Sequence, residues 1–255
     1  MRPKIVLTVD GGTLRKRSID EDIKVAKKSG YDGIDYIATP QDLFVSPSRV
    51  LEVAKKYNMP ILTLHQPLLL ILFSPEMLFP RMIHLAQFFP DLLLTNHHLS
   101  GMINIQKDPE IVKKLLYLGK KSDIQFSFEL NPAEVWFYPR ETHEPQEFAL
   151  FMKKNKLPMT LDTSHVATHN EDIVSFFSEN HTYIEFIHLS DYKDGKQHLP
   201  LGLGNLPIKE LFQEIKHKKW NKVITYEIAN FPEASSNKEK EKLIQQSLTM
   251  AHKYL

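Results

Sequence analysis

Six successive apolar segments of this sequence each end in an imidazole or a carboxylate. The residues at these ends are His65, His97 with His98, Glu129, Asp162 with His165, His188, and Glu227. Imidazole nitrogens and carboxylate oxygens bind divalent metals and transfer protons at enzyme sites. One such residue alone is usually an ordinary hydrogen-bonded or solvated side chain, so the signal lies in their succession. If the fold brings these ends together, the sequence predicts a polar cluster capable of acid–base or metal chemistry.

A cluster of this composition needs a positive charge. Neighbouring carboxylates repel one another and burial raises their pKa values, so they would take up protons unless a cation lay among them. A divalent metal supplies that charge, and mixed imidazole and carboxylate ligands suit zinc, manganese, iron or cobalt. The residue types therefore predict a divalent-metal site.

The segments that must position these residues are short, apolar and about thirty residues apart, with amphipathic stretches between them. Several are continuous apolar runs, which is typical of parallel strands covered by helices. We predict eight strands, at Lys4–Val9, Gly33–Ile37, Pro60–Leu64, Leu92–Thr95, Ile124–Phe128, Pro158–Leu161, Glu185–Leu189 and Lys222–Tyr226.

Helical segments alternate with these strands. Ser18-Ile-Asp-Glu21 is a capping-box pattern, and Gly30 is expected to end the helix that it opens. Further helices are predicted at 46–57, 75–89, 109–121, 145–155, 172–179, 208–219 and 238–254. Pro80 should kink or split the helix at 75–89, because proline interrupts helical hydrogen bonding.

Eight strand–helix units in 255 residues predict a single (β/α)8 TIM barrel that forms one domain over residues 1–255. An open doubly wound sheet is the alternative, since periodicity does not show closure. The turn Asp10-Gly-Gly-Thr lacks the spacing of a dinucleotide-binding loop. In a barrel the catalytic groups lie at the C-terminal ends of the strands, so closure would direct the polar ends to one axis.

Composition limits the partners. The chain has 32 Lys and Arg against 31 Asp and Glu and carries a net charge of +1, which disfavours a nucleic-acid or membrane binder. It has no cysteine, which excludes disulfides, thiolate metal sites and cysteine nucleophiles. The apolar runs Ile5–Val9 and Ile61–Phe73 are too short or interrupted to serve as a signal peptide or membrane span. A soluble cytoplasmic protein is expected.

Five motifs resemble the xylose isomerase-like barrel superfamily, which contains sugar isomerases, ketose epimerases, inositol-catabolism enzymes and endonuclease IV of AP endonuclease family 2. They are Phe128-Glu-Leu-Asn131, Leu161-Asp-Thr-Ser-His165, Ile187-His-Leu-Ser-Asp191, His198-Leu-Pro-Leu-Gly-Leu-Gly204 and Tyr226-Glu227. The resemblance covers nearly the whole chain in element order. It is specific for the superfamily and less so for one activity.

In the epimerase-like branch one metal is held by strands five to eight, so the resemblance implies Glu129, Asp162, His188 and Glu227 as ligands. Three carboxylates and one imidazole favour Mn²⁺, with Zn²⁺, Co²⁺ or Fe²⁺ as alternatives. The resemblance further implies that Glu129 and Glu227 move a proton through a cis-enediolate on a metal-chelated ketose. It implies that His165 contacts substrate oxygens. The expected function is a metal-dependent isomerase or epimerase of a small carbohydrate, either a sugar or a sugar phosphate.

Endonuclease IV gives the alternative function, a metal-dependent phosphoesterase. By its pattern His65 and His98 would join Glu129 at a further metal, and a dinuclear site would suit hydrolysis. In an epimerase these two histidines would instead hydrogen-bond sugar hydroxyls, which we favour.

The third zinc of endonuclease IV needs His165, an Asp, and a His two positions later. Here His198 fits the last position, but Lys196 stands where the Asp is required. A protonated ammonium group does not bind a metal, so this site and DNA cleavage are disfavoured.

The loops keep more than one interpretation each. His198 and Lys196 are counted with the histidines above as substrate-binding candidates, although solvated loop lysines are the simpler interpretation of Lys196 and Lys193. Trp136-Phe137-Tyr138 would form a lid over a sugar ring, pack in a subunit interface, or pack under the helix at 75–89. Only one of His97 and His98 should face the barrel axis.

Two broader questions stay open. A homo-oligomer is compatible with the sequence. A barrel without activity, holding a structural or sensory metal, is a third interpretation.

Overall fold

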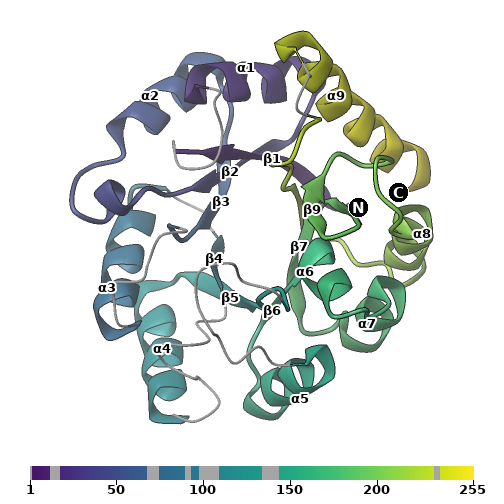
Figure 1. Ribbon diagram of the computed structural model, residues 1–255. Coiled ribbons are helices and arrows are strands. Elements are labelled where there is room, and N and C mark those ends of the chain that lie inside the picture. The colour runs from purple at the N-terminus through teal and green to yellow at the C-terminus, as the bar shows by residue number, and fades with distance from the viewer. Residues whose placement is uncertain are drawn as a thin grey trace.

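The computed structural model describes residues 2–11, 18–67, 75–89, 93–97, 109–133, 144–232 and 236–255. Its parallel strands close into a barrel in the order β1-β10-β7-β6-β5-β4-β3-β2, with the helices outside (Figure 1). Closure confirms the predicted TIM barrel and excludes the open sheet. The barrel strands are β1 (Lys4–Asp10), β2 (Gly33–Ile37), β3 (Ile61–His65), β4 (Leu93–His97), β5 (Gln125–Glu129), β6 (Met159–Asp162), β7 (Ile184–Leu189) and β10 (Val223–Tyr226).

The outer helices follow the predicted order. They are α1 (Ile19–Ser29), α2 (Ser48–Tyr57), α3 (Pro75–Ala86), α4 (Pro109–Ser122), α5 (Pro145–Asn155), α7 (Ile173–Asn180), α8 (Ile208–His217) and α9 (Asn237–Tyr254). Ser18 and Glu21 form the expected capping box, and Gly30 ends α1 in a left-handed conformation with φ +90°. The helix α3 continues through Pro80 and is not split. Because Pro80 lies early in α3, its missing N–H costs one hydrogen bond near the helix start.

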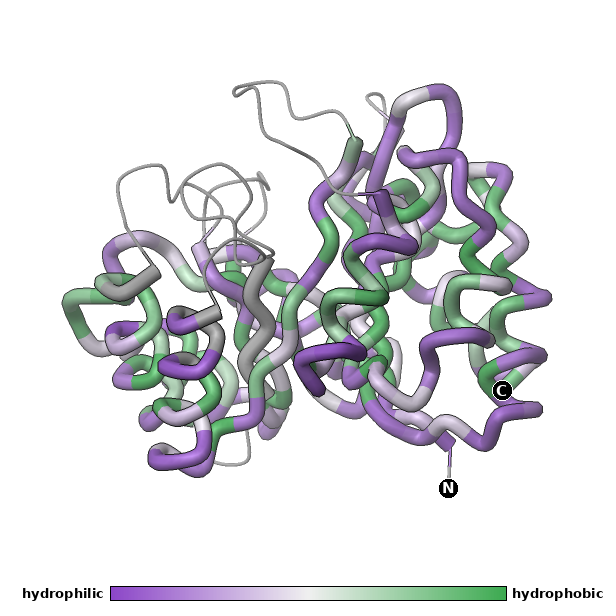
Figure 2. Tube along the Cα trace, turned by 90° about the horizontal axis from the view of Figure 1, so that it is seen from below, coloured by the Kyte–Doolittle hydropathy of each residue, from purple (hydrophilic) through white to green (hydrophobic). Residues whose placement is uncertain are grey.

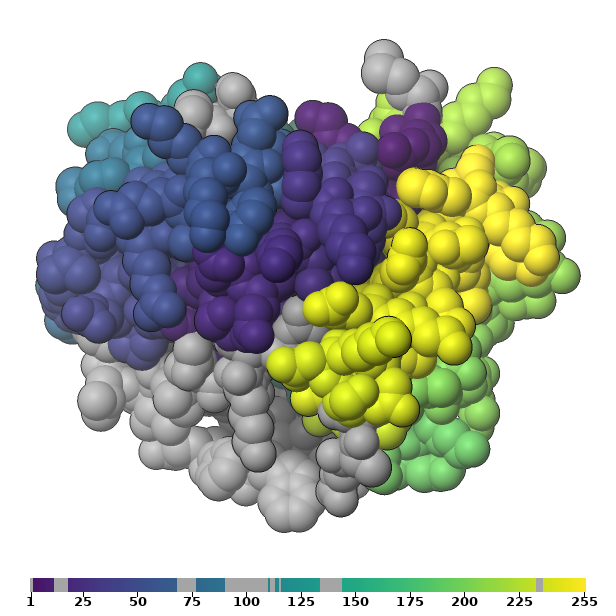
Figure 3. All heavy atoms as spheres, turned by 90° about the horizontal axis from the view of Figure 1, so that it is seen from above, coloured from purple at the N-terminus to yellow at the C-terminus, as the bar shows by residue number. Residues whose placement is uncertain are grey.

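Amphipathic spacing packs these helices onto the strands. In α8, Ile208, Leu211, Phe212 and Ile215 are all buried, which is the i, i+3, i+4, i+7 pattern of one helix face. Figure 2 shows green and purple residues alternating along the helices in the same way. Figure 3 shows the face where α1 lies between α2 and the last helix, α9. None of the described helices is long and apolar enough to cross a membrane.

Three short elements were not expected from the sequence. They are the 3-10 helix η1 (Pro40–Leu43), the helix α6 (Thr163–Thr168), and the antiparallel hairpin of β8 (Asp191–Lys193) and β9 (Lys196–Leu199). The helix α6 and the hairpin follow β6 and β7, so both lie at the C-terminal ends of the barrel strands.

The barrel interior changes from apolar to polar along the strands. Successive side chains of a strand face opposite sides of the sheet, so alternate residues share one face. Along β1 and β10 the interior positions read Val6, Thr8, Asp10 and Val223, Thr225, Glu227. Val6 and Val223 pack with Phe186 in a small apolar cluster apart from the main core. The ionisable groups therefore gather at the C-terminal end.

Candidate metal centre

Barrel closure brings together the four residues that the resemblance named as metal ligands. Glu129, Asp162 and His188 end or nearly end β5, β6 and β7, and Glu227 follows β10 directly. All four are buried, and one ligand atom from each lies within 4.8 Å of the others. Strands far apart in the sequence thus deliver three carboxylates and one imidazole to one point.

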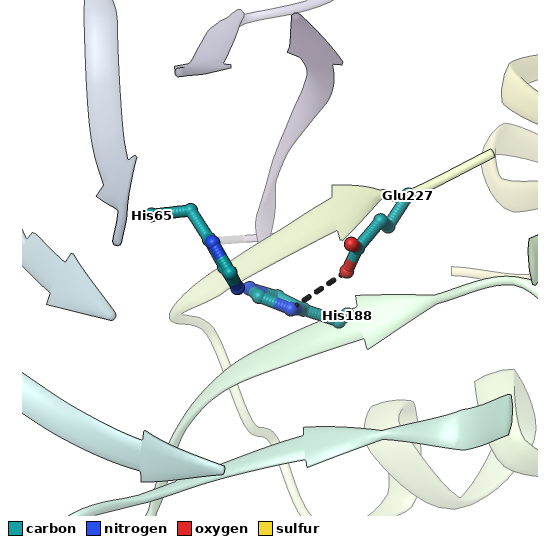
Figure 4. A group of neighbouring side chains, drawn as sticks. All are labelled: His65, His188 and Glu227. Atoms are coloured by element: carbon teal, nitrogen blue, oxygen red, sulfur yellow. Dashed lines mark ion pairs between the residues drawn. The ribbon is translucent and has the colours of Figure 1, made fainter. Parts of the chain in front are cut away.

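His188 lies between the two glutamates. Its Nδ1 atom is 2.9 Å from Glu227 Oε2 and 3.1 Å from Glu129 Oε2, and Figure 4 shows the ring directed at Glu227. Within the described part of the chain, the other ring nitrogen of His188, Nε2, has no hydrogen-bond partner. Ligand atoms on neighbouring vertices around a metal with bonds of about 2.1 Å lie about 3 Å apart. The spacing fits coordination of a cation.

The two carboxylate oxygens of Asp162 have different roles, and one of them is a further candidate ligand atom. Oδ1 accepts hydrogen bonds from the Ser164 hydroxyl and the His165 backbone N–H, both at 2.8 Å. Oδ2 is buried and has no hydrogen-bond partner among the described residues. Asp162 therefore caps α6 with one oxygen and leaves the other for a cation.

The pKa values of the clustered residues indicate that the carboxylates favour positive charge beside them. Burial opposes protonation of His188, but Glu129 and Glu227 outweigh it and hold the pKa of His188 well above its usual value. Burial alone would raise the pKa of Glu227, whereas the imidazoles of His188 and His198 hold it well below the usual range. The Glu227 carboxylate thus stays ionised beside these imidazoles.

His65 borders the same centre from β3. It is fully buried, its Nε2 lies 3.9 Å from Glu129 Oε2, and its Nδ1 lies 2.6 Å from the carbonyl oxygen of Gln66. Its ring centroid is 5.6 Å from that of His188. His65, His188 and Glu227 form a second group with ligand atoms within 4.8 Å (Figure 4).

His165 and His198 both lie beside Asp162, each with a ring nitrogen 4.0 Å from Oδ2. The His165 Nδ1 atom is 2.9 Å from Glu129 Oε1 and 2.9 Å from the Leu130 carbonyl oxygen. Burial opposes protonation of His165, yet Asp162 and Glu129 raise its pKa to about 9. The two imidazole rings meet edge to face at 5.3 Å, and with Asp162 they form a third group of ligand atoms within 4.8 Å.

Other predicted residues lie farther out or cannot be placed. Lys196 is exposed on β9, two residues before His198, and Lys193 is exposed on β8. The backbone of His97 pairs in register with Glu129, while His98 lies outside the described residues. The Trp136-Phe137-Tyr138 segment also lies outside them.

Asp191 has a structural role that sequence reasoning missed. Its buried carboxylate accepts the backbone N–H groups of four residues at 2.9–3.0 Å: Tyr192, Gly202, Gly204 and Leu206. A side chain at Gly204 would collide with this carboxylate, since an added Cβ would lie 2.2 Å from Asp191 Oδ1. The signal was the pairing of an acidic residue after β7 with the nearby Gly-Leu-Gly sequence. Asp191 thereby shapes the loop that follows β9, the strand that carries His198.

Residues 110–254 match a family model described as the xylose isomerase-like TIM barrel, which is more than half of the chain. The chain belongs to this family. The matched region contains all four candidate ligands, and β1 to β4 complete the xylose isomerase-like barrel on the N-terminal side. No curated protein sequence matches the chain.

Several solved structures share the barrel. The D-allulose 3-epimerase from Methylomonas sp. in complex with D-allulose has a TM-score of 0.74 and 13% identity, over 99% of this chain and 98% of that one. The 3-keto-D-glucoside 4-epimerase YcjR from E. coli has a TM-score of 0.71 and 12% identity, over 97% and 100%. The probable 3-DHS dehydratase AsbF from Bacillus anthracis has a TM-score of 0.70 and 13% identity, over 97% and 98%. At these identities the likeness establishes the fold.

Proposed function

We propose that this xylose isomerase-like barrel is a divalent-metal-dependent isomerase or epimerase of a small sugar or sugar phosphate. The observation that carries the proposal is the buried group of Glu129, Asp162, His188 and Glu227, whose ligand atoms converge within 4.8 Å. Structures of the same fold include epimerases of sugars, one with D-allulose bound, which supports a carbohydrate substrate.

The donor set favours Mn²⁺, because three carboxylates and one imidazole make a hard, oxygen-rich site. When bound, the metal would supply Lewis acidity, which polarises a substrate carbonyl and acidifies the neighbouring C–H bond. Glu129, Asp162, His188 and Glu227 would hold it. The same proposal includes a soluble, cytoplasmic protein whose partner is a carbohydrate.

Proton transfer is assigned to Glu129 and Glu227. They lie on β5 and after β10, and both have an oxygen within 3.1 Å of His188 Nδ1, so they approach the centre from different sides. One carboxylate removes the proton from a substrate carbon and the other, or the same one, returns a proton to give the product. His165 orients Glu129 through its 2.9 Å contact with Oε1.

The surrounding histidines are assigned to the substrate. His65 lies 3.9 Å from Glu129 and is fully buried, and His198 lies 4.0 Å from Asp162 and is half-buried. Their ring nitrogens are suited to hydrogen-bond the hydroxyl groups of a sugar. Lys196, exposed two residues before His198, is the cation that would contact a charged substituent.

Proton exchange tests this proposal directly. Purified protein supplied with Mn²⁺ should catalyse incorporation of deuterium from heavy water at a carbon next to the carbonyl of a ketose. Glu227→Gln should lose this exchange, while Glu185→Gln, which changes a half-buried carboxylate paired with Lys222 outside the candidate centre, should keep it. A protein that binds Mn²⁺ but exchanges no proton in any ketose of a broad panel would refute the function.

A metal-dependent phosphoesterase is the second candidate. It is favoured by the two additional ligand groups, His65 with His188 and Glu227, and Asp162 with His165 and His198. Two or more zinc ions per chain, together with release of phosphate or cleavage of abasic DNA, would support it over the isomerase. One metal ion per chain and no phosphate release would exclude it.

A further inference from the structure

A layer of buried polar side chains lies beneath the candidate metal centre. In most TIM barrels the interior is filled by branched apolar residues. Here the interior positions just below the centre are instead hydroxyl or carboxyl groups with at most 1% exposure: Thr8, Asp35, Thr63, Ser127, Thr160 and Thr225. Buried polar groups are normally hydrogen-bonded, so each member of the layer should have a partner.

Most of the layer satisfies that expectation internally. Asp35 accepts hydrogen bonds from the Thr63 hydroxyl at 2.5 Å and from the Thr8 hydroxyl at 3.3 Å. The hydroxyls of Ser127 and Thr160 bond to each other. Asp35 is the only carboxylate of this layer in the described part of the barrel.

Two buried polar atoms, one in this layer and one in the centre above it, have no hydrogen-bond partner among the described residues. They are Nε2 of His188 and Oγ1 of Thr225. His188 and Thr225 are register partners on the adjacent strands β7 and β10, so their side chains face the same interior. The two glutamates that approach His188 lie at Nδ1, which leaves Nε2 for another partner.

The Asp35 carboxylate interacts electrostatically with the imidazoles of His188 and His65. Burial raises the pKa of the Asp35 carboxyl, and the imidazoles of His188 and His65 act against that rise more strongly than any other charged group. The carboxylate therefore lies within electrostatic range of both rings.

We propose that a buried water molecule connects the Nε2–H of His188 with Thr225 Oγ1 and the Asp35 carboxylate, and that Asp35 thereby positions His188 as a metal ligand. Buried waters typically bridge two to four polar groups that would otherwise lack partners. A histidine that binds a metal through one ring nitrogen usually donates the other N–H to a carboxylate, carbonyl or water, which fixes its tautomer and orientation.

This role rests on the proposed metal centre and adds a residue from β2 to it. With the proton held on Nε2, the lone pair of Nδ1 is directed at the point where Glu129 and Glu227 converge. Asp35 does not touch substrate or metal, so it is a positioning residue and not a catalytic one.

The first measurement is the affinity for Mn²⁺ by titration calorimetry in four variants. Asp35→Leu should weaken binding about 10- to 100-fold, the effect typical of removing such an outer partner. Asp35→Asn, which keeps an acceptor oxygen, and Thr225→Val should each weaken it less. Thr160→Val is the matched control, since Thr160 belongs to the same layer but bonds to Ser127, and it should leave the affinity within about twofold of wild type.

The second measurement uses metal-free protein and so does not depend on the proposed function. Wild type should show a slowly exchanging Nε2–H signal of His188 in ¹H–¹⁵N spectra, and Thr225→Val and Asp35→Asn should each expose it to solvent exchange. Thr160→Val should retain it.

The outcomes separate the two proposals. If wild type binds no metal but shows the protected signal, the metal-dependent function fails and the water bridge stands. If wild type binds Mn²⁺ while Asp35→Asn and Thr225→Val change neither affinity nor exchange, the positioning role of Asp35 is overturned. A loss of affinity in Thr160→Val equal to that in the Asp35 variants would also overturn it, because the effect would then belong to the core in general.

Discussion

The backbone N–H of His165 donates to Asp162 Oδ1 at 2.8 Å, so a candidate metal ligand is also the N-cap of the helix that carries a candidate substrate-binding residue. The sequence Asp-Thr-Ser-His contains both functions, because a strand-terminal aspartate three residues before the histidine reaches the first helical turn. The cap occupies Oδ1, so Oδ2 is the oxygen that has no hydrogen-bond partner among the described residues.

Substitution of Asp162 should separate these two functions. Asp162→Asn keeps an oxygen that can cap α6, so the metal-free protein should unfold near the wild-type temperature while its Mn²⁺ affinity falls steeply. Asp162→Ala should lose the affinity and in addition about 1 kcal/mol of stability. Asp172→Ala, which removes the cap of α7, is the control: it should cost similar stability and leave Mn²⁺ binding intact. Equal Mn²⁺ affinity in Asp162→Asn and wild type would remove Asp162 from the ligand set.

Glu227→Gln should abolish turnover with little loss of stability. The amide has the same shape, so no cavity opens, but it neither accepts the substrate proton nor carries the charge that faces His188. We expect a fall in kcat of about 1,000-fold or more, measured with the ketose that shows solvent deuterium exchange. Activity near the wild-type level would show that the acid–base assignment is wrong.

The strand positions were predictable because each strand is a short apolar run with a polar residue at its end. The runs ending at Glu129, Asp162 and His188 needed only barrel closure to bring their ends together, and the general rule for barrels supplied that step. Their identity as ligands came from the family resemblance and stays a prediction.

The elements and contacts that the sequence did not predict have no periodic pattern of apolar residues. The helix α6 is six residues long and lacks a repeating apolar face, and the hairpin of β8 and β9 is formed largely of polar residues. Asp191 was noted only as the last residue of the motif Ile187-His-Leu-Ser-Asp191, and its backbone partners lie up to fifteen residues away along the loop. The partner of a carboxylate in such a loop follows from the folded backbone, which pattern and composition do not specify.

Metal removal should lower the thermal stability of the wild type. It should not change the stability of a variant in which a metal ligand has been substituted. A ligand present at 100 times its Kd stabilises a folded protein by about 2.7 kcal/mol. For a chain of this size that corresponds to roughly 5–10 °C in Tm. The comparison is between Mn²⁺-loaded and EDTA-treated protein in differential scanning calorimetry. Asp162→Asn should show no such difference, and an identical Tm of loaded and stripped wild type would contradict a built metal site.

Asp191→Asn should destabilise the protein by about 2–3 kcal/mol, because an amide cannot accept all four backbone N–H groups that the carboxylate binds. Urea unfolding of the metal-free protein measures this. Asp194→Asn is the matched control, since Asp194 is exposed in the same hairpin and should change stability by less than about 0.5 kcal/mol. Because Asp191 pairs with Leu199, the neighbour of His198 on β9, we also expect a higher KM in Asp191→Asn. If both variants were equally stable, Asp191 would not organise this loop.

Lys196→Asp tests whether a second metal can bind on the outer side of the centre. Asp162, His165 and His198 already place ligand atoms within 4.8 Å of one another, and position 196 lies two residues before His198 on the same strand. Exchanging an ammonium for a carboxylate changes the local charge by two units and adds an oxygen donor. We expect the zinc content per chain to rise, measured by elemental analysis after incubation with excess zinc and gel filtration. Lys216→Asp makes the same charge change on the exposed face of α8 and should leave the content unchanged. A rise in both variants would indicate nonspecific surface binding, and no rise in either would show that these three residues do not form a metal site even when the carboxylate is supplied.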